Sequence, residues 1–258
     1  MFFHARLFFY SLSFFLVLEV ICGEAVSDFL VSLIFNKPIL MAAIIVFFLF
    51  FVFIFTLKTG KKISMTIIPV LLAFSSWGLL SLIDTSKEKG IFAFLASTVY
   101  YACMLGIHRL KLYEKDQIAR GLIASSAVAT LFLFYSVSYG VYMNFAIPLS
   151  ILMILFFVMT TLVSYQYFQL IQNDNRIVWI YSAVIGIAIT EISWIVNFWP
   201  FGYLTTGVIM LIFYYVLWDL VQSHFLEDLS KKKVVVNMAL FGFLIVMVLT
   251  SSRWMPIV

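Results

Sequence analysis

Residues 38–57 read PILMAAIIVFFLFFVFIFTL and contain no charged side chain. An α-helix needs about 20 consecutive apolar residues to cross the hydrocarbon core of a bilayer. Hydrocarbon offers no hydrogen-bond partner to the backbone, so a run of this length is stable there only as a helix or in a closed β-barrel. Barrel strands would alternate in polarity over about ten residues, and this stretch does not. It is therefore predicted to be a transmembrane helix.

The same pattern recurs along the whole chain of 258 residues, of which 64% are hydrophobic and only 11% charged. An ordinary globular domain is about 45–50% apolar and about 25% charged, so the composition excludes a soluble globular protein. Apolar runs separated by charge clusters predict an all-α, polytopic transmembrane helix bundle of nine spans, forming a single membrane domain over residues 1–258. The predicted spans are 6–23, 38–57, 63–83, 91–109, 118–140, 146–170, 177–199, 203–224 and 233–250.

Three local features refine this topology. The first 23 residues resemble a signal peptide in their basic start, but Glu19 inside the apolar region favours retention as the first helix. Residues 25–35 have an apolar face opposite Asp28 and Ser32, which is typical of a short interfacial helix. Pro69, in the middle of the third span, predicts a kink there.

The basic residues predict an orientation, because short cytoplasmic loops carry the excess of Lys and Arg. With the N-terminus inside, twelve of the sixteen Lys and Arg residues fall on the inner side. We therefore expect a multi-pass protein of the cytoplasmic membrane with its N-terminus inside and its C-terminus outside. The same distribution explains the net charge of +4, so the expected contacts are with membrane lipids and not with nucleic acid.

Motifs of known chemistry are missing from the sequence. It has no phosphate-binding loop, no His-Glu-x-x-His, no Gly-x-Ser-x-Gly and no spaced acid pair of the kind that holds Mg²⁺. The loops are too short for a catalytic domain. We expect no catalytic residue, no metal site and no cofactor; an intramembrane lipid-modifying enzyme stays open as the least favoured alternative.

Glu191 stands out because it lies well inside the seventh predicted span, on the order of 12 Å from its outer end. An ionisable side chain inside a span costs a few kcal/mol, so it needs a partner, a cavity or a function. No Lys or Arg lies at a similar depth in any predicted span. Neutral donors such as Tyr135 and Tyr139 are therefore its expected partners.

The helix of Glu191 also has an ordered face. Small and polar side chains recur on it at steps of three and four residues: Ser182, Gly186, Thr190, Ser193 and Asn197. Such residues let helices approach closely and form hydrogen bonds across their interface. Glu191 and Trp194 lie one position round from this stripe. Two interpretations are open: a tightly packed helix with one satisfied acid, or a solute or proton site beside the acid.

The segment Thr190-Glu191-Ile192-Ser193-Trp194 through Phe198-Trp199-Pro200, followed by Thr205-Thr206 and the Tyr214-Tyr215 pair, resembles an uncharacterised family of polytopic membrane proteins from small-genome candidate-phylum bacteria. The resemblance covers the last third of the chain. It implies a bacterial membrane protein and transfers no activity or catalytic residue. It also implies that Glu191 and Trp194, which lie in the quoted segment, are candidate functional residues.

The functional expectation follows from Glu191. We expect a transporter, or a protein that binds a proton or small solute, with a substrate-binding site in the outer half of the bundle formed by Glu191, Trp194, Asn197 and Thr206. The alternative is a non-catalytic scaffold or subunit whose partners are other membrane proteins or further copies of the chain. Scaffolds rarely need a buried acid, so the sequence favours transport.

Overall fold

The structure, a computed structural model, describes residues 2–22, 38–60, 62–113, 116–145 and 147–251. Every regular element in these residues is a helix, and nine of the helices are long and apolar enough to cross a membrane. The all-α prediction and its nine apolar helices are thereby confirmed. The contacts divide the chain into two compact units, residues 1–130 and 131–258, although no shift in composition marks this boundary. The membrane domain expected over residues 1–258 is thus built as two units.

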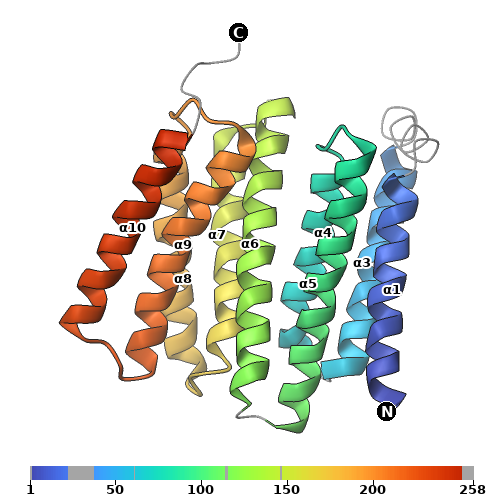
Figure 1. Cartoon of the computed structure of the whole chain (residues 1–258), viewed down its shortest axis with the longest axis horizontal. Coiled ribbons are helices and arrows are strands. Elements are labelled where there is room, and N and C mark those ends of the chain that lie inside the picture. The colour runs from blue at the N-terminus through green and yellow to red at the C-terminus, as the bar shows by residue number, and fades with distance from the viewer. Residues whose placement is uncertain (1, 23–37, 61, 114–115, 146, 252–258) are drawn as a thin grey trace. The chain divides into compact units, whose positions relative to one another are not determined.

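Each predicted span corresponds to one helix in Figure 1. The first unit holds α1 (Phe2–Cys22), α3 (Pro38–Gly60), the 3₁₀ turn η1 (Ile63–Thr66), α4 (Ile67–Leu80), α5 (Ser86–Leu112) and the first part of α6 (Gln117–Phe145). The second unit holds the rest of α6 and then α7 (Leu149–Phe168), α8 (Asn175–Val196), α9 (Tyr203–Phe225) and α10 (Lys231–Ser251). The interfacial helix expected over residues 25–35 lies outside the described residues.

The third span begins with a 3₁₀ turn, and the kink expected at Pro69 in mid-span is wrong. The α-helical part starts at Ile67, which places Pro69 in the first turn of α4. The first N–H groups of a helix have no intrahelical acceptor, so the missing N–H of proline removes no hydrogen bond there.

Aromatic side chains hold the first unit together. The Phe14 ring stacks on Tyr100 with ring centres 4.5 Å apart, and it lies 5.8 Å from Phe48. Phe14 lies on α1, Tyr100 on α5 and Phe48 on α3, so these rings join the three helices. The Ser11 hydroxyl also donates to the carbonyl of Ser97 at 2.9 Å, a hydrogen bond that ties α1 to α5.

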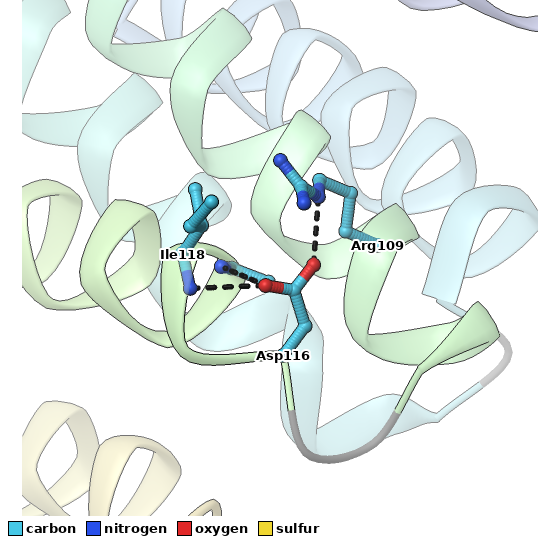
Figure 2. Close-up of polar contacts among 4 residues, drawn as sticks. Arg109, Asp116 and Ile118 are labelled. Atoms are coloured by element: carbon cyan, nitrogen blue, oxygen red, sulfur yellow. Dashed lines mark hydrogen bonds and ion pairs between the residues drawn. The ribbon is translucent and has the colours of Figure 1, made fainter.

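A single carboxylate organises the connection between α5 and α6 (Figure 2). One oxygen of Asp116 accepts hydrogen bonds from the backbone N–H groups of Ile118 and Ala119, as an N-cap residue does. The other oxygen pairs with Arg109 at 2.7 Å. Burial raises the pKa of Asp116, but the hydrogen bonds and the Arg109 charge outweigh it and hold the pKa below its ordinary value.

In the second unit, α10 packs on α9 and leaves most of its surface exposed. Phe213 and Phe241 meet with ring centres 4.9 Å apart, and Asn237 donates a hydrogen bond to Asp219. The remaining surface of α10 is strongly apolar; Phe243, for example, is 67% exposed. Hydrocarbon is the solvent in which such a surface is stable, since lipid tails cover apolar side chains without cost.

Candidate functional site

The face of α8 that carries the small and polar stripe is the buried face. Ser182 and Ser193 are fully buried, and Gly186 touches α7 so closely that a Cβ atom there would lie 2.2 Å from Thr161 Oγ1 and 3.0 Å from the Phe157 carbonyl oxygen. Thr190 donates back to the Gly186 carbonyl at 2.8 Å. The stripe thus forms the tightly packed seam between α7 and α8 that its spacing predicted.

The opposite face of α8 is exposed between Ile180 and Trp194 and has one charged side chain there. Ile180, Val184 and Ile187 are each at least half exposed, as is Trp194 at 51%. Glu191 lies on this same exposed face. These residues recur at steps of three and four, so they form one continuous stripe along the helix. We call the stripe formed by Ile180, Val184, Ile187, Glu191 and Trp194 the α8 outer face.

Glu191 has no hydrogen-bond or ion-pair partner within the part of the chain that the structure describes. The donors expected from the sequence bond elsewhere. The Tyr135 hydroxyl pairs with Thr160 Oγ1 at 2.8 Å, and the Tyr139 hydroxyl donates to the carbonyl of Ser193 at 3.0 Å. The interpretation in which Glu191 is a satisfied acid inside the bundle is therefore wrong, because helical rotation carries its side chain to the outer face.

Trp194 is the other polar side chain of the α8 outer face. Its ring meets Phe198 edge-on, with centroids 5.7 Å apart. Its indole N–H has no acceptor among the described residues. An acceptor and a donor, both without a partner, thus lie three residues apart on one face.

The four residues predicted to form one site differ in their exposure. Glu191 and Trp194 share the α8 outer face, whereas Thr206 is only 2% exposed and lies on the buried side of α9. Asn197 is half-buried at the C-terminal cap of α8, where its backbone N–H bonds to the carbonyl of Ser193. The structure thus places Glu191 and Trp194 on one exposed face and buries Thr206 on α9, and a substrate site formed by all four residues stays a prediction.

Sequence reasoning missed a cluster of hydroxyl groups buried inside the second unit. Besides the Tyr135–Thr160 pair, Ser164 donates to the Tyr214 hydroxyl at 3.3 Å, which links α7 to α9. All four side chains are fully buried. The spacing of Thr160 and Ser164 on α7 was a detectable signal, since residues four apart share one face of a helix.

Among the described residues, no group of three or more His, Cys, Asp or Glu side chains is placed to hold a metal ion. Glu191 therefore belongs to no such group within the described part of the chain.

Comparison with protein families matches residues 54–251, more than half of the chain, to the family described as protein of unknown function (DUF5656). Comparison with curated proteins and with solved structures finds no match. The matched region includes α8 and its outer face. The chain therefore belongs to this family of unknown function.

Proposed function

We propose that the protein associates laterally, within the membrane, with another membrane-spanning helix that docks on the α8 outer face. The observation that carries this proposal is the exposure of Glu191 on an otherwise apolar face, without a partner in the described chain. The required partner helix presents a hydrogen-bond donor opposite the acid. This role corresponds to the scaffold or subunit that the sequence left as the alternative.

The cost of the unpartnered acid supports lateral association. Insertion scales assign a few kcal/mol to an acidic side chain at the centre of a span, and less towards its ends. A docked helix would remove the acid from lipid and supply it with a hydrogen bond. The stripe of small residues on α8 is already used against α7, so the α8 outer face is the side of this helix that remains for a partner.

The proposal includes the orientation predicted from the basic residues. The protein lies in the cytoplasmic membrane of a bacterium with its N-terminus inside, and Glu191 then falls in the outer half of the bilayer. A reporter enzyme fused after Val258 is expected to be active only outside the cell, because nine spans and an internal N-terminus place the C-terminus there. Reporter activity in the cytoplasm would contradict this orientation.

Photo-cross-linking in native membranes tests the lateral association. A photoreactive amino acid is placed at Ile187, one turn from Glu191, and at Ile91, an exposed position on α5 in the first unit. We expect protein adducts from position 187 that decrease strongly when Glu191→Leu is added. Lipid adducts alone at position 187, or protein adducts that do not depend on Glu191, would contradict the proposal. Adducts from position 91 serve as the control, since they should not respond to Glu191→Leu.

Transport of a proton or a small neutral solute is the second candidate, and the buried hydroxyl cluster favours it. The Tyr135–Thr160 and Ser164–Tyr214 pairs place hydroxyl groups from α6, α7 and α9 inside the second unit. Hydroxyl groups both donate and accept, so they can bind a neutral solute or relay a proton. Protein reconstituted in sealed vesicles should then take up protons or a small neutral solute, and the substitutions Tyr135→Phe and Tyr214→Phe should reduce this uptake. Uptake that is absent, or unchanged in both variants, would remove this candidate.

A further inference from the structure

We infer that the helix docked on the α8 outer face is α8 of a second copy of the chain. This inference rests on the proposed lateral association and names its partner. In the dimer, the Glu191 carboxyl group of each copy accepts a hydrogen bond from the Trp194 indole N–H of the other.

The complementarity of the two polar groups on this face carries the inference. Glu191 provides an acceptor and Trp194 a donor, and neither has a partner in the described chain. Two copies that pack through the same face would form two hydrogen bonds, each from the Trp194 N–H of one copy to the Glu191 carboxyl group of the other. A different protein would have to supply a donor for Glu191 and, separately, an acceptor for Trp194.

Symmetry makes the pairing possible in a membrane. Copies inserted in the same orientation are related by a two-fold axis along the membrane normal, which yields a self-complementary interface. Their α8 helices then run parallel, and residues with the same number lie at the same depth. Trp194 is three residues beyond Glu191, about 4.5 Å further along the axis at the standard helical rise. Helical side chains lean towards the N-terminus, so the long indole extends back towards the depth of the acid.

The charges of the chain favour the indole over a cation as the donor. Every Lys and Arg of the predicted spans lies near a span end, so a second copy offers no basic side chain beside Glu191. The neighbouring positions Val184 and Ile187 are β-branched, with few rotamers to lose on packing, and they supply apolar contact on the same face. The hydrogen bonds thereby determine the register of the two helices.

The main test measures dimerisation of the full chain by sedimentation equilibrium in density-matched detergent. Wild-type protein should form dimers, and Trp194→Phe should weaken dimerisation about tenfold to a hundredfold, because it keeps the ring but removes the donor from two interhelical hydrogen bonds. Glu191→Leu should weaken it to a similar extent, whereas Glu191→Gln keeps an acceptor and should weaken it less.

Two matched controls come from the same chain. Trp179→Phe removes the indole N–H of the other exposed tryptophan of α8, which is 45% exposed and stacks on Tyr165. Glu19→Gln neutralises the exposed acid near the end of α1 in the first unit. Both variants should dimerise as the wild type does. Thermal unfolding of every variant separates loss of the interface from loss of the fold.

Cysteine cross-linking tests the symmetry independently. A two-fold axis beside the α8 outer face brings the two copies of residue 187 together, so Ile187→Cys should form a disulfide-linked dimer in native membranes, and Ile91→Cys should not. A monomeric wild-type protein, or a dimer that is insensitive to both Trp194→Phe and Glu191→Leu, would overturn the inference. If position 187 still gives Glu191-dependent photo-adducts to a different protein, only the identity of the partner is wrong. If it gives lipid adducts alone, the lateral association fails as well.

Discussion

Replacing Gly186 with alanine should disrupt the seam between α7 and α8. An added Cβ atom would lie 2.2 Å from Thr161 Oγ1, whereas ordinary contacts begin at 3.4 Å, so this pair must separate by about 1.2 Å. The Phe157 carbonyl oxygen, at 3.0 Å from the same position, belongs to the backbone and can move only with α7. Relief therefore requires the two helices to shift apart.

The expected cost is that of overpacking a well-packed core, about 1–3 kcal/mol in the free energy of unfolding. Alanine also favours the helix over glycine by about 1 kcal/mol, which offsets part of this cost. The matched control is Gly121→Ala in α6, where nothing lies within 4 Å of the added Cβ and only the helical preference should act. The two variants should therefore differ by about 1–3 kcal/mol, or about 2–12 °C in Tm at about 2–4 °C per kcal/mol.

The assay is thermal unfolding of the purified protein in detergent, followed by tryptophan fluorescence. Thr161→Ala should be nearly neutral by itself, because its buried hydroxyl makes no hydrogen bond in the described chain. Combined with Gly186→Ala, it should recover part of the lost stability, since it removes the nearest clashing atom. Equal Tm values for Gly186→Ala and Gly121→Ala, or no recovery in the double variant, would refute the close contact of α7 and α8.

Three further changes probe other contacts. Tyr135→Phe removes the hydroxyl bonded to Thr160 and should lower the free energy of unfolding by about 1 kcal/mol, measured by SDS-induced unfolding; an unchanged midpoint would argue against the bond. The pKa of Asp116 is lower in the folded protein than in the unfolded chain. Its contribution to the free energy of unfolding is therefore complete above the ordinary pKa of 3.8, and it is lost as the pH falls through the lower folded value. Asp116→Asn should therefore flatten the acid side of the Tm–pH profile, and a profile with the wild-type slope would contradict this role. Asn237→Leu breaks the bond to Asp219 and should speed hydrogen exchange in α10 but not in α8; equal exchange in wild type and variant would show that the bond does not hold α10.

The nine helices were predictable because the solvent expected for this chain imposes a simple rule. Apolar runs such as residues 38–57 must satisfy their own backbone hydrogen bonds in hydrocarbon, and run length alone then locates the helices. The residues at which each helix begins and ends were less predictable. Pro69 illustrates this, since its effect depends on whether it falls in the first turn of a helix or in the middle.

The candidate site was predictable in part. Periodicity identified the Ser182–Gly186–Ser193 stripe as a packing face, because small residues at helical spacing allow close approach wherever they occur. Periodicity also placed Glu191 and Trp194 on one face, since residues three apart share a face, and both side chains are exposed in the structure. It grouped Thr206 with them, and the structure places that side chain on a buried surface.

Composition and run length were sufficient to show that this chain is a set of apolar helices, because those properties depend on each segment alone. The direction in which Glu191 points depended on which neighbouring helices cover α8, and only the packed structure contains that information. A rotation of about 100° per residue turns Glu191 away from the buried side that carries Ile189 and Ser193. The same glutamate would be an interior ligand in one packing and a surface acid in another, and here α7 occupies the opposite face.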